Sequence, residues 1–330
     1  MDDERIAALA ERVRAGDRRS LARAITLVES ARDSDRPAAE ALLAAILPAA
    51  GRSIRLGISG VPGVGKSTFI EAFGLHVIGR GHRVAVLAVD PSSKVSGGSI
   101  LGDKTRMEML SRHPDAFIRP SPAGRTLGGV ARRTREAMLL AEAAGFDVVF
   151  VETVGVGQSE TAVAEMVDLF LLLLLPGGGD ELQGLKKGIV EIADLLLVNK
   201  ADGDLAPAAR RTAADYRGAI RMLRPSNPPW KPEVQAVSAA TGEGLAAAWD
   251  TVERYRALME GAGALARRRA AQARAAMWTE IEEGLRAAFR DDPDVGARIG
   301  EIERRVAAGR DPPAAAARRL VDRFLGRRSL

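Results

Sequence analysis

The sequence predicts a doubly wound α/β domain with a mostly parallel sheet, flanked by helical extensions on both sides. From residue 53 to about residue 260, apolar strand-like runs alternate with helical segments, as in successive β-α-β units. The runs at 148–151 and 169–175 contain only apolar residues, which is typical of strands buried on both faces. The first run of the domain leads through a glycine-rich turn into a helix. Ligands of such folds bind at the carboxyl ends of the strands.

Residues 1–50 are predicted to form a helical N-terminal extension. Apolar residues recur there at three- and four-residue steps: Ile6, Leu9, Val13, Leu21, Ile25 and Val28. Gly16 and Asp17 interrupt the pattern, and Pro37 lies where the first turn of another helix is expected. The extension carries no candidate catalytic residue.

Residues 51–260 are assigned to the nucleotide-binding domain. Six strands are expected in it, at residues 53–59, 83–90, 147–152, 169–175, 195–199 and 233–238. The functional motifs described below follow the ends of these strands. They are therefore expected to meet at one edge of the sheet.

The segment from Gly60 to Ser67 fits the phosphate-binding pattern G-x-x-x-x-G-K-[ST]. Its glycines let backbone N–H groups converge on phosphate oxygens, and the following helix points its positive end at the same anion. Lys66 is expected to neutralise the β- and γ-phosphates, and the Ser67 hydroxyl to bind Mg²⁺. The candidate nucleotide contacts are Gly60, Val61, Pro62, Gly63, Val64, Gly65, Lys66, Ser67 and Thr68.

The tetrapeptide Asn199-Lys200-Ala201-Asp202 closes the strand predicted at 195–199. In N-K-x-D, the Asp202 carboxylate accepts hydrogen bonds from guanine N1–H and N2–H₂, and adenine would leave it unpaired. The stem of Lys200 is expected to lie along the base, with Asn199 tethering the loop. Ser238 and Ala239 fit the remaining base-contacting loop, whose backbone N–H would reach guanine O6. GTP or GDP is therefore the predicted nucleotide.

Two carboxylates at predicted strand ends are candidates for the metal site. Glu152 opens Glu-Thr-Val-Gly, which resembles the D-x-x-G switch of GTPases, and Asp90 ends the strand at 83–90. The N–H of Gly155 is expected to sense the γ-phosphate. In the polar loop at 97–107, Asp103 is a candidate for Mg²⁺ or for the attacking water, and Arg106 for a catalytic cation.

Composition excludes several other classes of protein. The chain has no cysteine, and its three histidines are dispersed, which excludes disulfides and thiolate metal sites. The net charge is +5, but arginines alternate with acids and aromatics make up only 4%, so we expect no nucleic-acid role. The longest apolar run is too short to span a membrane, and the N-terminus does not resemble a secretory signal. A soluble cytoplasmic protein is expected.

Residues 261–330 are predicted to form a C-terminal helical arm. A long helix to residue 289 is followed by one ending near residue 308 and a last one after Pro313. An apolar stripe runs along the first of them: Met277, Ile281, Leu285, Ala288 and Phe289. We expect the arm to serve dimerisation, because a protruding helix pair needs a partner for this stripe. The alternative is that these helices pack back on the core.

Several segments together resemble one known family, the MeaB/ArgK GTPases of the signal-recognition/nickel-insertion class. They are residues 90–93 (DPSS), 97–107, 127–130 (LGGV), 152–160 (ETVGVGQSE), 179–188 (GDELQGLKKG) and 199–203 (NKADG). The resemblance covers residues 50–245, and the flanking helices fit the family in layout.

The resemblance implies a GTPase that chaperones methylmalonyl-CoA mutase, gates adenosylcobalamin loading and protects the mutase from inactivation. Hydrolysis would be slow in the chain alone and accelerated by the mutase. The family also implies a homodimer joined partly through the C-terminal helices, and suggests a cobalamin adenosyltransferase as a further partner. The loop at 177–188 resembles an extra switch of the family, which makes Asp180 and Lys186 candidates for coupling the mutase to hydrolysis.

Three other functions are less consistent with the sequence. Family members have been labelled kinases of an amino-acid transport system, but Asn199–Asp202 favours guanine over the ATP of a kinase, and no separate acceptor site is visible. A nickel-insertion GTPase would need Cys/His clusters, which the chain lacks. A protein-targeting GTPase would need a methionine-rich groove, whereas the eight methionines are scattered.

Overall fold

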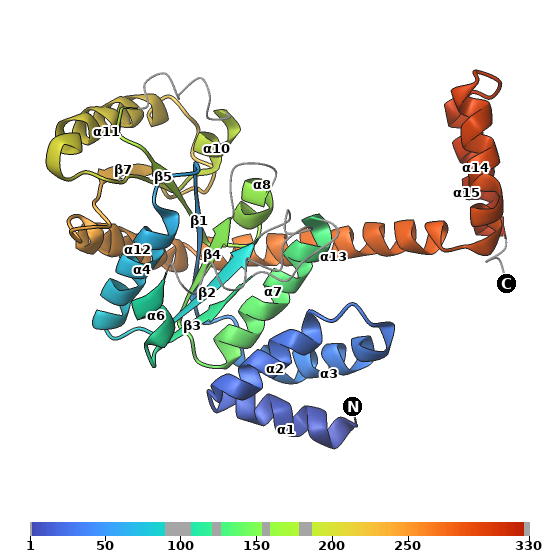
Figure 1. Cartoon of the computed structure of the whole chain (residues 1–330), viewed down its shortest axis with the longest axis horizontal. Helices are drawn as coiled ribbons and strands as arrows, with labels where there is room; N and C mark the ends of the chain where they lie inside the picture. Colours follow the sequence, from blue (N-terminus) through green and yellow to red (C-terminus); the bar gives the residue numbers. More distant parts are fainter. Residues whose placement is uncertain (1, 90–106, 121–126, 154–158, 178–186, 327–330) are drawn as a thin grey trace. The chain divides into compact units, whose positions relative to one another are not determined.

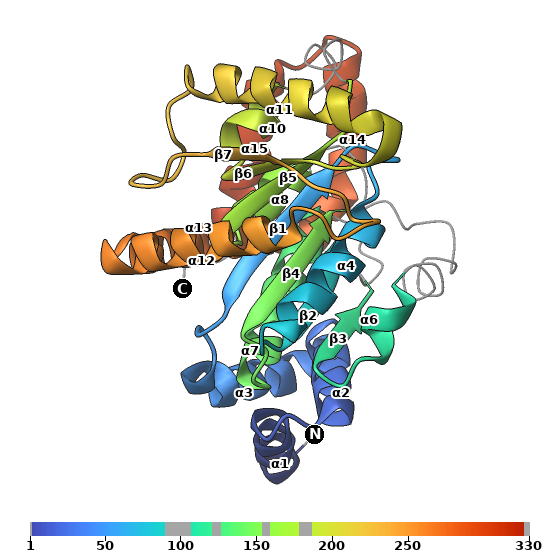
Figure 2. The ribbon, with the colours of Figure 1, turned by 90° about the vertical axis from the view of Figure 1, so that its left-hand side faces the viewer.

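The structure is a computed structural model that describes residues 2–89, 107–120, 127–153, 159–177 and 187–326. Within these residues, seven strands form one sheet in the order β3-β2-β4-β1-β5-β6-β7, and every neighbouring pair is parallel. The strands are β1 (Ile54–Gly60), β2 (Val84–Val89), β3 (Ala116–Arg119), β4 (Val148–Thr153), β5 (Leu169–Leu174), β6 (Leu195–Val198) and β7 (Glu233–Ala236). The predicted doubly wound α/β fold is confirmed, with β1 between β4 and β5 at the centre of the sheet (Figure 2).

One strand was missed in the sequence. β3 is only four residues long and pairs with β2 alone, at the edge of the sheet. Its two C-terminal residues, Ile118 and Arg119, are only partly buried. A short edge strand of mixed polarity, preceded and followed by proline, gives too weak an alternation to stand out from a loop.

The two faces of the sheet are covered by separate sets of helices. One face packs against α7 (Leu127–Ala143), α8 (Ser159–Ala164), α10 (Lys187–Ile192) and α11 (Ala206–Ile220). The other face packs against α4 (Lys66–Gly79), α6 (Glu108–Arg112) and α12 (Leu245–Gly261). Residues alternate between the two clusters along the central strands: Phe150 faces α4, whereas Val149 and Val151 face α7. This burial on both faces explains the continuous apolar runs of β4 and β5.

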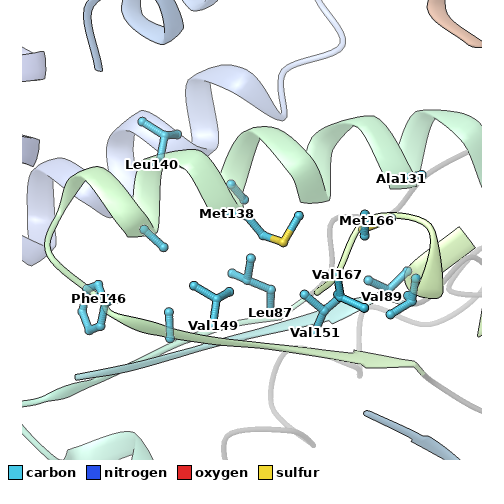
Figure 3. Packing of buried hydrophobic residues seen from close by; sticks show 14 of the residues in the cluster. Leu87, Val89, Ala131, Met138, Leu140, Phe146, Val149, Val151, Met166 and Val167 are labelled. Carbon is cyan, nitrogen blue, oxygen red and sulfur yellow. The ribbon is translucent and has the colours of Figure 1, made fainter. Parts of the chain in front are cut away.

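The N-terminal helices form a further layer over α7. They are α1 (Asp3–Arg14), α2 (Arg18–Val28) and α3 (Arg36–Ile46), with 3-10 turns at Asp33–Asp35 and Leu47–Ala49 (Figure 1). Gly16 takes a left-handed φ of 80°, and the Asp17 side chain caps α2. In Figure 3, Met138 of α7 lies over Val149 and Leu87, while Leu140 points away from the sheet. The helix is therefore buried on both sides.

Aspartates at the amino-terminal ends of the strands link neighbouring strands by hydrogen bonds. Asp147, Asp168 and Asp194 directly precede β4, β5 and β6. Asp147 accepts the backbone N–H of Arg83 at 2.7 Å, and Asp168 accepts that of Arg55 at 2.8 Å. Asp194 likewise accepts the N–H of Phe170 at 2.9 Å. Each carboxylate thus satisfies a donor of the adjacent strand, which fixes the register at the end of the sheet opposite the predicted motifs.

The chain divides into two compact units, residues 1–272 and 273–330. The long helix α13 (Ala264–Arg290) begins in the first unit. There its Arg269 donates to both carboxylate oxygens of the buried Asp168, at 2.8 and 2.5 Å. Arg269 also donates to the carbonyls of Gly51 and Ser53. Burial alone would lower the pKa of Arg269, but its hydrogen bonds to Asp168 and the charge of that carboxylate raise it.

The second unit contains the rest of α13, then α14 (Pro293–Ala307) and α15 (Pro313–Gly326), as the sequence predicted. Asp311 between the last two helices accepts from Arg305 and Arg319. Phe289 packs edge-to-face on Phe324, so it does not belong to an open stripe. Four large apolar side chains of α13 remain exposed: Met277, Trp278, Ile281 and Leu285. Among the described residues, no helix is long and apolar enough to cross a membrane.

Candidate functional site

The phosphate loop joins the end of β1 to the start of α4. Gly63 and Gly65 have φ values of 81° and 89°, which residues other than glycine rarely adopt. Gly65 directly precedes the first residue of α4. A Cβ on Gly60 would lie 2.8 Å from the carbonyl oxygen of Leu173. Glycine at these positions therefore lets the loop turn tightly and sit against β5. Among the described residues, no side chain caps the N-terminus of α4, and N–H groups of a first helical turn are suited to binding an anion.

Lys66 lies within this loop as the phosphate-binding motif requires. Its Nζ donates to the carbonyl oxygen of Gly60 at 2.7 Å. Burial lowers the pKa of Lys66, while the negative charges of Glu152 and Glu160 act to raise it. The ammonium is thus held at the carbonyl of Gly60, at the start of the loop. Ser67 and Thr68 occupy the first turn of α4 directly after it.

The tetrapeptide Asn199–Asp202, which is predicted to bind the base, follows β6 and contacts the phosphate loop directly. Asn199 is buried, and its Nδ2 donates to the carbonyl oxygen of Val64 at 2.9 Å. The Nζ of Lys200 donates to the carbonyl oxygen of Gly63 at 2.8 Å. Lys200 is also the one described non-glycine residue with positive φ, at 58°. A left-handed lysine is strained and uncommon, and such strain clusters at ligand-binding loops.

The loop after β7 completes this side of the site. The hydroxyl of the buried Ser238 donates to Asp202 Oδ1 at 2.6 Å, leaving the other carboxylate oxygen for a ligand. The N–H of Ala239 in this loop donates to Asn199 Oδ1 at 3.1 Å. The sequence could not reveal this bond, because it joins two buried groups 40 positions apart. Asn199 therefore binds the phosphate loop and the Ala239 loop together.

Glu152 is the last residue but one of β4, lies in register with Ile58 of β1, and is only 5% exposed. The next residues of the two strands, Thr153 and Ser59, are fully buried, and their hydroxyls bond at 2.8 Å. This contact fixes the end of β4 against the strand that carries the phosphate loop. The negative charge of the Glu152 carboxylate acts to raise the pKa of Lys66.

The oxygen atoms available as metal ligands in this site fit Mg²⁺. Ser67 and Glu152 supply the hydroxyl and carboxylate oxygens that Mg²⁺ prefers. Within the described residues, no group of three or more His, Asp or Glu side chains could hold a metal by itself. Mg²⁺ in nucleotide sites is also held by phosphate oxygens and water.

The structure thus brings the described candidates together at one edge of the sheet. The phosphate loop follows β1, and Glu152 lies near the end of β4. The loop of Asn199 follows β6, and the loop of Ser238 follows β7. Six further candidates lie outside the described residues: Asp90, Asp103, Arg106, Gly155, Asp180 and Lys186.

Glu160 was missed as a candidate. It lies in the first turn of α8, is 4% exposed, and its charge acts on Lys66. The sequence offered one signal, since Glu160 ends the segment ETVGVGQSE, but nothing in that segment shows that the carboxylate is buried.

Comparison with known proteins gives consistent results. The family model described as methylmalonyl Co-A mutase-associated GTPase MeaB matches residues 21–294. The methylmalonic aciduria type A homolog, mitochondrial, of Mus musculus is 48% identical over 322 residues, covering 94% of this chain and 78% of the relative. GTPase ArgK of Escherichia coli is 51% identical over 254 residues, 77% of each chain. A crystal structure titled LAO/AO transport system kinase superposes with a TM-score of 0.79 at 37% identity, covering 98% of this chain and 99% of that one.

Proposed function

Since this chain belongs to the MeaB family of GTPases, we propose that it is a chaperone of methylmalonyl-CoA mutase. GTP binding and hydrolysis gate the loading of adenosylcobalamin in this proposal, and they protect the mutase from inactivation. The description of the family model names the mutase, and the mouse relative is named for methylmalonic aciduria. These names support the mutase as the partner.

The observation that supports the nucleotide assignment is the pair of hydrogen bonds that the Asn199 side chain makes with Val64 and Ala239. It holds the phosphate loop and the base-reading loops as one unit, so that a single ligand reaches both. Ser238 donates a hydrogen bond to one oxygen of Asp202, which supports the proposal that this carboxylate accepts from guanine N1–H and N2–H₂. With the N–H of Ala239 already engaged, the next amide, of Ala240, is our candidate donor to guanine O6.

The proposed chemistry is in-line attack of water on the γ-phosphate. Lys66 exchanges its bond to the Gly60 carbonyl for the β- and γ-phosphates, and offsets charge that moves to the bridging oxygen. The N–H groups of the phosphate loop and of the start of α4 hold the phosphates in place. Ser67 and Glu152 would hold Mg²⁺, which would supply further charge neutralisation. Asp90, Asp103, Arg106 and Gly155 remain proposed contributors to this step.

Asp180 and Lys186 are proposed to couple the mutase to hydrolysis, and Lys186→Ala is expected to reduce stimulation by the mutase while sparing basal hydrolysis. The exposed side chains Met277, Ile281 and Leu285 support a homodimer built on the C-terminal arm. A cobalamin adenosyltransferase as second partner, and a cytoplasmic location, complete the proposal.

The kinase alternative fits less well. The solved relative titled a transport system kinase has the same fold over nearly its whole length, so fold alone does not separate the two functions. The paired Asp202 and Ser238 favour guanine as the base, and guanine is the base of a GTPase.

Protection of the mutase tests this proposal. Purified methylmalonyl-CoA mutase is followed during prolonged turnover, alone and with this chain plus GTP. Slower loss of mutase activity with the chain is expected, and Lys66→Ala is expected to remove the effect. An unchanged inactivation rate with the native chain would contradict the chaperone role while leaving the GTPase assignment in place.

A further inference from the structure

A pocket of about 570 Å³ is lined by the end of α11 and the start of β7, at one edge of the sheet (Figure 2). Its volume is in the range of about 300–1,000 Å³ that is common for ligand pockets. Part of the lining is apolar and comes from both sides: Ile220, Leu223, Pro225, Pro232 and Val234. The pocket therefore offers an apolar surface that suits an aliphatic side chain.

The described residues that line this pocket also include three cations and one carboxylate: Arg217, Arg221, Lys231 and Glu233. The carboxylate is already paired, because Nη2 of Arg254 in α12 donates to both of its oxygens at 2.9 Å. The side chains of Arg221 and Lys231 are exposed and have no ion-pair or hydrogen-bond partner among the described residues. The helix dipole explains a cation at the C-cap of α11, such as Arg221, but it does not explain Lys231 before β7. The pocket thus holds two cations that are available to an anionic ligand.

The outer edge of β7 adds backbone groups to the same pocket. The N–H of Glu233 donates to the carbonyl of Asp194 at 3.3 Å, on the side toward β6. Because successive residues of a strand alternate, the N–H and carbonyl of Val234 face away from β6. The carbonyl accepts from Nε of Arg217 at 3.0 Å, whereas the N–H has no partner within the described part of the chain. One backbone donor is therefore left beside the cations.

The composition of this edge favours an acidic occupant over a second copy of the chain. Arginine, lysine and proline at an edge strand oppose pairing with a like edge, because the two sets of cations repel each other and proline has no N–H. Here Arg217 covers one carbonyl of β7, and Pro232 directly precedes the strand. The same cations attract a segment that carries carboxylates.

We propose that this pocket binds an extended acidic segment of a partner protein, with an aliphatic side chain between its carboxylates. The aliphatic side chain occupies the apolar lining, and the carboxylates pair with Arg221, Lys231 and the terminal nitrogens of Arg217. The N–H of Val234 donates to the backbone of the bound segment. Neither the mutase nor GTP hydrolysis enters this proposal, so its failure would leave the proposed function intact.

A nucleic acid fits the pocket less well than an acidic peptide. Single-stranded nucleic acids bind through aromatic side chains on which bases stack, and none of the described residues lining the pocket is aromatic. Trp230, next to Lys231, is 5% exposed, and its Nε1 donates to the carbonyl of Asp194 at 2.9 Å. Its ring is therefore not available for stacking with a base.

Fluorescence anisotropy with the full chain and a labelled peptide tests the proposal. The probe is a short peptide in which single leucines are flanked by glutamates, and a second peptide has glutamine in place of each glutamate. We expect the acidic peptide to bind at least about tenfold more tightly than the glutamine peptide. The double variant Arg221→Gln/Lys231→Gln is expected to bind the acidic peptide at least about tenfold more weakly than the native chain. Its intrinsic GTP hydrolysis is expected to stay unchanged.

Two further double variants make the result specific to the pocket. Arg210→Gln/Arg211→Gln removes the same charge from exposed positions of α11 outside the pocket and is expected to bind the acidic peptide as the native chain does. Arg221→Glu/Lys231→Glu reverses the charge and is expected to bind a peptide with lysine in place of glutamate, in preference to the acidic one.

Three results would overturn the proposal. One is the absence of binding of the acidic peptide to the native chain. Another is equal weakening in the two double glutamine variants, which would show attraction to the overall positive charge only. The third is binding of a labelled single-stranded oligonucleotide that depends on Arg221 and Lys231 when binding of the peptide does not.

Discussion

Asn199 donates its side-chain amide to the carbonyl of Val64 at 2.9 Å, and this bond joins the loop after β6 to the phosphate loop. The same amide accepts the N–H of Ala239 at 3.1 Å. Asn199 is 2% exposed, so each of these bonds is made without competition from water. The geometry of the nucleotide site thus depends on one side chain that we do not expect to perform chemistry.

Asn199→Ala is predicted to weaken GDP binding and to destabilise the fold. The substitution leaves a backbone N–H and a carbonyl without their partner, at a cost of about 1–3 kcal/mol. Calorimetry of GDP binding and thermal unfolding measure the two effects. Asn227→Ala is the matched control, because Asn227 bonds Asp194 at the opposite edge of the sheet and should affect stability only. Equal GDP affinity in the native chain and Asn199→Ala would contradict the bridging role.

Lys66→Ala is predicted to abolish tight GTP binding. The ammonium is expected to contact the phosphates, and losing a charge-assisted contact of about 3 kcal/mol corresponds to roughly a hundredfold weaker binding. Equilibrium binding of GTP in the presence of Mg²⁺ measures the loss. Lys231→Ala, which removes an exposed lysine far along the chain, should bind GTP normally. Retained affinity in Lys66→Ala would refute the phosphate assignment.

Asp202→Asn is predicted to shift the base preference from guanine toward xanthine. An amide in place of the carboxylate cannot accept both guanine donors, which costs about 1–3 kcal/mol. Competition between GTP and XTP for the purified variant measures the shift. The control is Asp204→Asn, two residues further along and exposed. An unchanged preference for GTP would remove Asp202 from base recognition.

Glu142→Gln is predicted to make stability less sensitive to acid. Burial alone would raise the pKa of Glu142, but bonds from Arg55, Ser53 and the N–H of Gly51 lower it below the ordinary 4.5. A carboxyl with a lowered pKa stabilises the fold fully above its unfolded value, and this stabilisation is lost as the pH falls through the folded value. The native chain should therefore lose its advantage over the variant below pH 4.5.

Urea unfolding at pH 7 and at about pH 3 measures this difference. At pH 7 the variant is expected to be less stable by about 1–3 kcal/mol, because the Arg55 guanidinium loses its charged partner. Glu11→Gln, at an exposed position of α1, provides the comparison. A stability difference between the native chain and Glu142→Gln that stays the same at both pH values would contradict the assigned ion pair.

Features carried by contiguous residues were predictable from the sequence. The turn between Gly60 and Ser67 and the long helices of the C-terminal arm each follow from local pattern and spacing. The continuous apolar runs of β4 and β5 likewise indicated a sheet covered on both faces.

Features made by distant residues were not predictable in this way. The Arg269–Asp168 pair joins positions 101 apart, and the Ala239–Asn199 bond depends on how two loops approach each other. The burial of Glu160 was not predictable either, because it depends on how α8 packs against Gly57 of β1. β3 was missed because an edge strand of four residues has little pattern to detect.

The most direct test of the central claim is the rate of GTP hydrolysis with and without purified methylmalonyl-CoA mutase, with ATP as the control nucleotide. We predict slow hydrolysis of GTP by the chain alone, strong acceleration by the mutase, and no comparable turnover of ATP. GTP turnover that is indifferent to the mutase would contradict the proposed partnership. Turnover of ATP alone would contradict the guanine assignment and favour the kinase alternative.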